Sequence, residues 1–219
     1  MAVEMKTFKS RKEWLAARGN TIGGSDAGSV LGLSKWRTNT QLWKILCGYE
    51  KPEDISDRPF VKYGTDAEPI LRKLFALHHP ELEVKYIANN MVVNSSYPFA
   101  HASLDGWIKD ENGRMGVLEI KTTEITSKLK AQEWADDHIP DQYFAQVCHC
   151  MLVCEYDFAI LCAELKVHRA DGSVEHRIVE RHIERSEVIA DIKLLERSER
   201  KFFKHVQNKT SPPTILPSI

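Results

Sequence analysis

Two extended apolar segments separated by a short turn constrain the fold of this chain more than any other feature. The alternation of apolar residues in Phe99–Ile108 and Met115–Lys121 predicts two β-strands, and Gly113 suits the left-handed position of a hairpin turn between them. In a regular hairpin Asp105 lies opposite Glu119, and directly paired residues share one face of a sheet. A β-bulge would shift this register.

The predicted hairpin gathers two carboxylates and an amine on one patch. Lys121 follows Glu119 by two residues and therefore lies on the same face. Glu119 stands between Leu118 and Ile120, and a carboxylate buried in an apolar strand is costly unless it has a partner. Hard oxygen ligands suit Mg²⁺ or Mn²⁺, ions that can orient a phosphodiester for hydrolysis. From these residues alone, the alternative is a solvated strand face with a cross-strand charge pattern.

The rest of the chain shows helical and extended patterns in turn. Helices are expected where apolar residues recur at spacings of three and four, and strands where they alternate. The expected helices are Ser10–Arg18, Thr40–Cys47, Asp66–His79, Ser127–Ala135, Asp141–Cys154 and Ser186–Gln207. The expected strands outside the hairpin are Val84–Ile87, Met91–Val93, Phe158–Val167 and Arg177–Ile183, and all strands from Val84 to Lys121 are expected to be consecutive and antiparallel.

This order of elements predicts an α/β (α+β) fold with a central mixed β-sheet flanked by helices. One domain spans residues 1–219: a helical part at 10–80, a sheet core at 84–184, a C-terminal helix at 186–207 and a tail at 208–219. The tail contains Pro212, Pro213 and Pro217 and is expected to be loosely held.

Charge and hydropathy narrow the classes of function. The net charge of −1 and the isoelectric point near 6.8 give the whole chain no general attraction to nucleic acid, so a phosphate-binding surface must be local. No apolar run approaches the ~20 residues that span a bilayer, and the first residues lack the apolar segment of a signal peptide. We therefore expect a cytoplasmic protein that does not associate with membranes.

Four of the five cysteines are close together in the sequence, so they could form a metal site or lie in the hydrophobic core. Their spacing lacks the C-x2-C pair of zinc sites and ferredoxin-like clusters, and their neighbours are apolar. We expect small buried core side chains, with an iron–sulfur site as the alternative. These four residues are Cys148, Cys150, Cys154 and Cys162.

The order of several short motifs resembles a known family. Asp105 followed by Glu119-Ile120-Lys121 matches the D…(D/E)-x-K motif of the restriction-endonuclease-like nuclease superfamily. Three further blocks resemble the lambda-exonuclease and YqaJ-type phage recombination nucleases. They are Arg18 with Ile22-Gly23-Gly24-Ser25-Asp26-Ala27, then Tyr63-Gly64-Thr65-Asp66-Ala67-Glu68, then Tyr143-Phe144-Ala145-Gln146-Val147. One departure is Leu104, where many members of the superfamily carry a proline.

The resemblance implies a restriction-endonuclease-like core and a role for each matching residue. Asp105 and Glu119 would bind two Mg²⁺ or Mn²⁺ ions, with the Ile120 carbonyl as a further ligand and Glu68 as an additional acidic ligand near the second ion. Glu68 is expected to open a helix, where capping is its alternative role. Lys121 would position or activate the attacking water.

The resemblance also implies residues around this centre. Gln146 would orient the water or Lys121, with structural hydrogen bonding in an apolar helix stripe as the alternative. Arg18, Ser25 and Ser103 would hold a terminal 5′-phosphate, since a guanidinium and free amides both favour anions. Lys35 and Arg37, which flank Trp36, are candidates for DNA contact or for an ordinary surface turn.

The function that the resemblance implies is 5′-to-3′ digestion of double-stranded DNA ends by a magnesium-dependent exonuclease. The family further implies a ring-shaped homotrimer that works with a single-strand-annealing recombinase in phage or prophage recombination in a bacterial host. One alternative is a structure-specific nuclease or a nuclease of opposite polarity on the same fold. Another is a non-catalytic DNA-binding or assembly protein, which the intact Asp105, Glu119 and Lys121 argue against.

Overall fold

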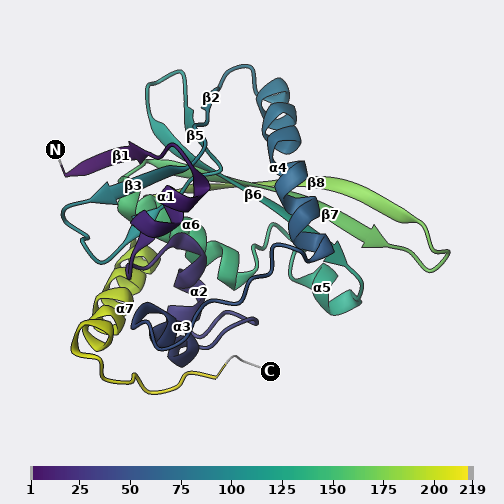
Figure 1. The fold of residues 1–219 in the computed structure, drawn as a ribbon. Coiled ribbons are helices and arrows are strands. Elements are labelled where there is room, and N and C mark those ends of the chain that lie inside the picture. The colour runs from purple at the N-terminus through teal and green to yellow at the C-terminus, as the bar shows by residue number, and fades with distance from the viewer. Residues whose placement is uncertain (1, 217–219) are drawn as a thin grey trace.

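The computed structural model describes residues 2–216, and it contains two β-sheets with helices packed around them (Figure 1). The first part comprises β1 (Val3–Thr7), α1 (Arg11–Arg18), the 3-10 turn η1 (Gly24–Asp26), α2 (Ala27–Val30), α3 (Asn39–Leu46) and α4 (Pro59–His78). The second part comprises β2 (Glu83–Lys85), β3 (Asn90–Asn94), β4 (His101–Ala102), β5 (Gly106–Lys109) and β6 (Met115–Ile125). The last part comprises α5 (Lys128–Gln132), α6 (Asp141–Cys154), β7 (Phe158–His168), β8 (Val174–Glu184) and α7 (Ile189–Asn208).

The larger sheet has five strands in the order β2-β5-β6-β7-β8. β6 and β7 are parallel, whereas the other neighbouring pairs are antiparallel. A parallel pair needs a crossover connection, which α5 and α6 provide. The predicted fold class, a mixed sheet flanked by helices, is therefore confirmed.

The prediction that the strands from Val84 to Lys121 follow one another in a single antiparallel sheet is wrong. β3 pairs with β1 and β4 in a separate three-stranded sheet, and the expected strand Phe99–Ile108 is split into β4 and β5. The split falls at residues 103–105, where side chains from other elements bond the backbone in place of a neighbouring strand. Alternation predicts extended backbone, but it does not predict which sheet a strand joins.

Helices α4 and α6 cover opposite faces of the larger sheet. On one face, Leu71 and Phe75 of α4 pack against Ile108, Leu118 and Ile160. On the other face, α6 packs against β6 and β7 and is itself covered by α2 and α7 (Figure 1). Successive residues of β6 point to opposite faces, so Glu119 points to the α6 side.

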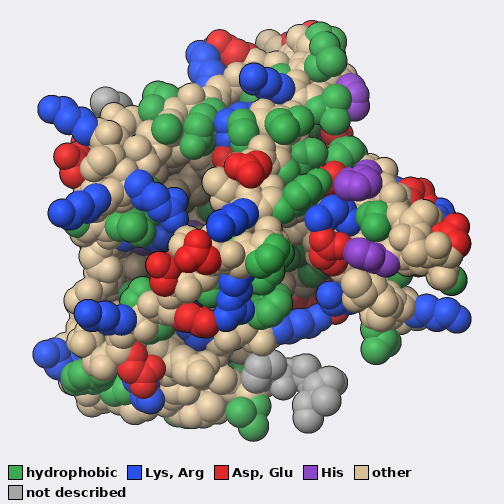
Figure 2. Space-filling model, turned by 45° about the vertical axis from the view of Figure 1, so that its right-hand side comes forward, with side chains coloured by type: hydrophobic (Ala, Val, Ile, Leu, Met, Phe, Trp, Pro, Cys, Tyr) green, Lys and Arg blue, Asp and Glu red, His purple; other side chains and the backbone are tan. Residues whose placement is uncertain are grey.

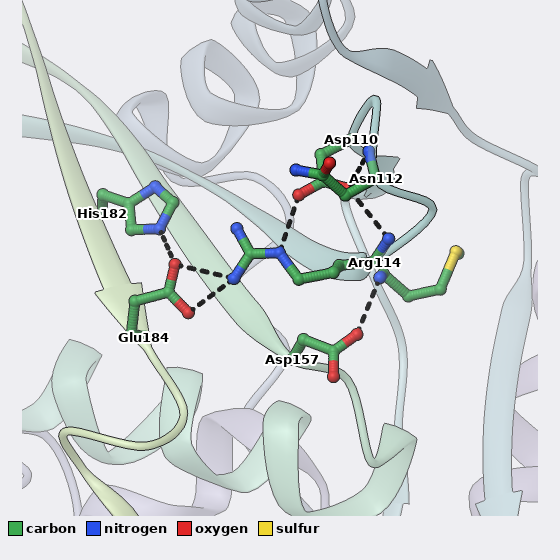
Figure 3. Close-up of polar contacts among 7 residues, drawn as sticks. Asp110, Asn112, Arg114, Asp157, His182 and Glu184 are labelled. Carbon is green, nitrogen blue, oxygen red and sulfur yellow. Dashed lines mark hydrogen bonds and ion pairs between the residues drawn. The ribbon is translucent and has the colours of Figure 1, made fainter.

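The predicted hairpin has the predicted register. Trp107 pairs with Val117 and Gly106 with Leu118, and Gly113 has a φ of +80° in the turn. Figure 3 shows how side chains fix the turn: Asp110 accepts hydrogen bonds from the Arg114 amide (2.8 Å) and side chain (2.8 Å). The Arg114 guanidinium also bonds Glu184 of β8, so the closed end of the hairpin is tied to the far edge of the sheet.

Helix α4 begins earlier than predicted. It starts at Pro59, which occupies the first turn, whereas Asp66 was expected to be the first residue. A proline in the first turn is tolerated because its missing N–H has no intrahelical acceptor there. The expectation that Glu68 opens a helix is therefore wrong: Glu68 lies in the middle of α4, away from the positive end of its dipole.

Two segments at the ends of the chain also differ from expectation. β1 was not predicted, and it pairs along its whole length with β3. The tail was expected to be loosely held, but the buried Asn39 side chain donates to the Pro213 carbonyl (2.8 Å) and accepts from the Ile215 amide (2.9 Å). Pro217 lies outside the described residues. Among residues 2–216, no helix combines the length and apolarity needed to span a bilayer.

The clustered cysteines are buried free thiols, as expected for core residues. Cys148, Cys150 and Cys154 pack in the core on the α6 side, whereas Cys162 packs on the α4 side of the sheet. Burial raises the pKa of the Cys148 thiol to about 12. Because the sheet separates Cys162 from the other three, these four thiols do not form one iron–sulfur site in the described structure.

Candidate active site

The structure brings Asp105, Glu119 and Lys121 together. Glu119 and Lys121 lie two residues apart on β6, and their side chains form an ion pair of 2.6 Å. Asp105 lies immediately before β5, and its Oδ2 accepts a hydrogen bond of 2.9 Å from the Ile120 amide. Beyond Leu118, β6 continues without β5 beside it, so this group lies where the two strands part.

Glu119 is the most deeply buried of the three, with a relative exposure of 1%. Its Oε1 accepts hydrogen bonds from Lys121 (2.6 Å) and from the side-chain amide of Gln146 on α6 (2.5 Å). Its Oε2 is also buried, and it has no hydrogen-bond partner in the described structure. An unpaired buried carboxylate oxygen is costly, so this oxygen is a candidate ligand for a cation.

Burial and mutual repulsion disfavour the charged forms of these carboxyl groups. Burial raises the pKa of Glu119 to about 7 against the opposing effect of Lys121, and Asp105 contributes to the rise. Burial also raises the pKa of Asp105. For Lys121, burial lowers the pKa, but Glu119 and Asp105 raise it by more, so the amine stays charged.

A third carboxylate, Glu68, is contributed by α4. It forms an ion pair with Arg72 one helical turn later, and burial followed by the charge of Asp105 raises its pKa. Arg72 also donates from Nε to the Asp105 carbonyl (2.6 Å), and its guanidinium lies 3.6 Å from the centre of the Tyr86 ring. Sequence reasoning missed Arg72, although its i+4 spacing from Glu68 was a usable signal.

The donor set available to a cation is small and consists of carboxylates. Within residues 2–216, no group of three or more His, Cys, Asp and Glu side chains is arranged around one metal position. Asp105 and Glu119 remain as two carboxylates, since Glu68 is held by Arg72. Mg²⁺ is commonly bound by one or two carboxylates and keeps several waters.

Two of the residues predicted to hold a phosphate, Arg18 and Ser103, contact Trp14. Arg18 stacks on the indole ring at 4.9 Å, and Ser103 Oγ accepts a hydrogen bond of 3.1 Å from the indole N–H. Arg18 also lies against Gly23, where an added Cβ would come within 3.0 Å of its Nη2. Ser25 is exposed two residues further on, in η1. Arg18 and Ser103 are thus close to each other, with Ser25 at the adjoining turn.

The two predicted DNA-contacting basic residues are paired with carboxylates. Arg37 bonds Asp26 at 2.5 Å, and Lys35 forms an ion pair with Glu133. Asp26 in turn accepts a hydrogen bond of 2.9 Å from the Gly23 amide, so Arg37 supports the turn against which Arg18 lies. Direct contact of Lys35 or Arg37 with DNA stays a prediction.

A cavity of about 170 Å³ lies beside Asp105 and Ser103, whereas Glu119, Lys121 and Arg18 are not among its lining residues. Asp105, Glu68, Ser103 and Trp14 all line it. The remaining lining residues are Arg11, Tyr86, Asn89, Asn90 and Leu104.

Comparison with known proteins assigns this chain to a family. A family model described as the YqaJ-like viral recombinase domain matches residues 13–157, a span that includes Asp105, Glu119, Lys121 and Gln146. This chain belongs to the YqaJ-like viral recombinase family. The uncharacterized protein YqaJ of Bacillus subtilis (strain 168) is 36% identical over 140 residues, which cover 64% of this chain. This match spans 41% of the B. subtilis protein, less than half its length.

Solved structures share the fold of this YqaJ-like chain at low sequence identity. An alkaline exonuclease, LHK-Exo from Laribacter hongkongensis, matches with a TM-score of 0.61 and 17% identity, covering 91% of this chain and 94% of its own. A phage-related exonuclease from Haemophilus somnus 129PT matches with a TM-score of 0.53 and 18% identity, covering 87% and 96%. The resemblance to lambda-exonuclease and YqaJ-type proteins is thereby confirmed at the level of family and fold.

Proposed function

We propose that this YqaJ-like protein is a metal-dependent exonuclease that digests double-stranded DNA from its ends in the 5′-to-3′ direction. The observation that carries the proposal is the buried, unpaired Oε2 of Glu119 beside Asp105 and Lys121. Carboxylates this close together favour a divalent cation between them. Two solved proteins with the same fold are named as exonucleases, which agrees with this chemistry.

The proposed cofactor is Mg²⁺ or Mn²⁺, with up to two ions in the site. Asp105, Glu119 and the Ile120 carbonyl would hold one ion, and Glu68 would serve a second if it separates from Arg72. The ions would supply Lewis-acid stabilisation of the phosphodiester during hydrolysis.

The protein's own groups would position the substrate around the ions. The Lys121 ammonium can donate to a phosphate oxygen or to the attacking water while it remains paired with Glu119. Gln146 orients Glu119 by donating to the same oxygen as Lys121, which leaves Oε2 free for a ligand. Arg18, Ser25 and Ser103 would bind the 5′-phosphate and so give the enzyme its polarity.

The proposed assembly is a homotrimeric ring that acts with a single-strand-annealing recombinase. The face drawn in Figure 2 carries Lys and Arg side chains interspersed with Asp and Glu, in keeping with the net charge of −1. A ring would gather the basic side chains of several subunits around the DNA. The mass of the purified protein in solution, compared with 25.1 kDa for one chain, tests this part.

Digestion of end-defined DNA tests the catalytic proposal. Linear duplexes with 5′-phosphate or 5′-hydroxyl ends and closed circles are incubated with the protein in Mg²⁺. We expect mononucleotide release from the phosphorylated 5′ ends, no cleavage of circles, and loss of both activity and metal response in Glu119→Ala. Cleavage of circles would identify an endonuclease, and an inactive wild-type protein in both Mg²⁺ and Mn²⁺ would favour a non-catalytic role.

A further inference from the structure

Asp105 lies in a segment that no neighbouring strand supports. Residues 103–105 connect β4 of the smaller sheet to β5 of the larger one, and they belong to neither ladder. A carboxylate on such a connection has no ladder hydrogen bonds to fix its backbone. Other groups must therefore determine where its oxygens lie.

The side chain of Asn90 takes the place of a strand for this segment. Its Nδ2 donates to the Leu104 carbonyl (2.8 Å), and its Oδ1 accepts from the Leu104 amide (2.8 Å). Asn90 is 3% exposed, and Nδ2 also donates to the Ile87 carbonyl (2.9 Å). A proline at position 104 would lack the N–H that donates to Oδ1. The non-proline residue at position 104 therefore suits the Asn90 side chain.

Further contacts extend this arrangement on both sides. Trp14 donates from its indole N–H to the Asn90 carbonyl (2.9 Å) and to Ser103 Oγ (3.1 Å). Arg72 bonds the Asp105 carbonyl, and the Ile120 amide bonds the Asp105 carboxylate. Of these residues, Asn90 is the one that bonds both the amide and the carbonyl of Leu104, the residue directly before Asp105.

We propose that Asn90 is a positioning residue for the metal site, acting through the Leu104 backbone to orient the Asp105 carboxylate. This inference rests on the proposed function, in which Asp105 is a metal ligand. Groups that orient a ligand commonly change metal affinity or activity by about 10- to 100-fold when removed. A carboxamide suits this role because its NH2 and its carbonyl oxygen offer donors and an acceptor in a single plane, which matches the carbonyl and the N–H of one peptide residue.

Asn94 provides a matched control at the other end of β3. It is similarly buried, at 2% exposure, and its side chain also makes three hydrogen bonds. Those bonds join it to the Val153 carbonyl (3.1 Å), the Glu155 carboxylate (3.0 Å) and the Ser96 amide (2.9 Å), and none reaches residues 103–105. Asn94→Ala therefore removes a comparable buried amide without touching the segment that holds Asp105.

The experiment compares wild type, Asn90→Ala, Asn94→Ala and Asp105→Ala. Mn²⁺ binding is measured by calorimetry without DNA, digestion by initial rates on phosphorylated duplex, and folding by chemical denaturation. We expect both asparagine variants to lose stability. Of these two, only Asn90→Ala should bind Mn²⁺ about 10- to 100-fold more weakly than wild type. Its kcat should fall with little change in KM, and higher Mn²⁺ should restore part of the rate.

Two results would overturn the inference in distinguishable ways. If the wild type binds Mn²⁺ and digests DNA while Asn90→Ala and Asn94→Ala have equal affinity for Mn²⁺, Asn90 is only structural. If the wild type neither binds Mn²⁺ nor digests DNA, the proposed function fails and the inference fails with it. If Asn90→Ala does not fold, Asn90→Ser replaces it, since one hydroxyl cannot reach both the amide and the carbonyl of Leu104. An affinity of Asn90→Ser for Mn²⁺ equal to that of the wild type would then contradict the inference.

Discussion

The Ile120 amide donates a hydrogen bond of 2.9 Å to Oδ2 of Asp105, although Asp105 lies outside the β5–β6 ladder. This bond joins the residue before one strand to the middle of the next. Because Ile120 directly follows Glu119 in β6, this bond places the Asp105 carboxylate beside Glu119. The pairing of these acids thus depends on side-chain contacts at the point where β5 leaves β6.

Lys121→Ala should separate metal binding from catalysis. Removing the ammonium takes a competing positive charge away from Glu119, so Mn²⁺ should bind at least as tightly as in wild type. Digestion of duplex DNA in Mg²⁺ should nevertheless fall by at least about 100-fold, because the group that orients phosphate or water is lost. Calorimetry and initial rates measure the two effects.

Lys166→Ala is the control for that variant. Lys166 lies on β7, is similarly buried, and forms an ion pair of 2.5 Å with Glu124 on β6. It should retain wild-type digestion. Equal losses in the two variants would mean that Lys121 has only a structural role.

Divalent metal should stabilise the folded protein through Glu119. Mg²⁺ or Mn²⁺ that binds only the native state should add about 2.7 kcal/mol to the free energy of unfolding when its concentration is about 100-fold above the dissociation constant. Glu119→Gln should lose this stabilisation, whereas Glu164→Gln, a comparably buried site on β7, should keep it. Thermal unfolding with and without metal tests this, and an equal gain in both variants would contradict it.

Local sequence patterns were sufficient for the hairpin and for most helices. Gly113 and the apolar alternation predicted the register of β5 and β6, and α6 has the predicted bounds Asp141–Cys154. Both features depend on residues close together in sequence, whose spacing directly determines which side chains share a face.

Features that depend on distant residues were not predictable in this way. A buried Asn90 that bonds Leu104 looks in the sequence like any asparagine at a strand end. The division of the strands into two sheets depends on β1 pairing with β3, which lies more than eighty residues away along the chain. The first turns of α4 were missed because Pro59 and Gly64 resemble loop residues unless packing is known.

Arg18→Ala should reduce the preference of the enzyme for phosphorylated ends. A charge-assisted bond from Arg18 to the terminal phosphate would be worth about tenfold or more in the ratio of rates on 5′-phosphate and 5′-hydroxyl duplexes. The rate on hydroxyl ends should change much less. Arg200→Ala is a suitable control because Arg200 also stacks on an aromatic ring, 4.8 Å from Phe99, but on α7. An unchanged ratio in Arg18→Ala would exclude a phosphate contact.

The buried pair of His149 and Glu199 should make stability depend on pH. Their side chains are fully buried and 2.7 Å apart, and His149 also bonds the His101 carbonyl at 2.9 Å. Burial lowers the pKa of His149, but Glu199 and the His101 carbonyl raise it by more, so it lies above its ordinary value of 6.5. Burial lowers the pKa of the nearby His101 to about 3, so His101 stays neutral over the range of interest.

A histidine whose pKa is raised by folding stabilises the protein fully below its ordinary pKa, and this stabilisation disappears as the pH rises through the raised value. Wild type should therefore exceed Glu199→Gln in free energy of unfolding most strongly near pH 5.5, and the difference should shrink towards pH 8.5. Urea denaturation of both proteins across this range measures the difference, in which the contributions of other titrating groups cancel. A difference that stays constant or grows with pH would show that His149 is neutral in the folded protein.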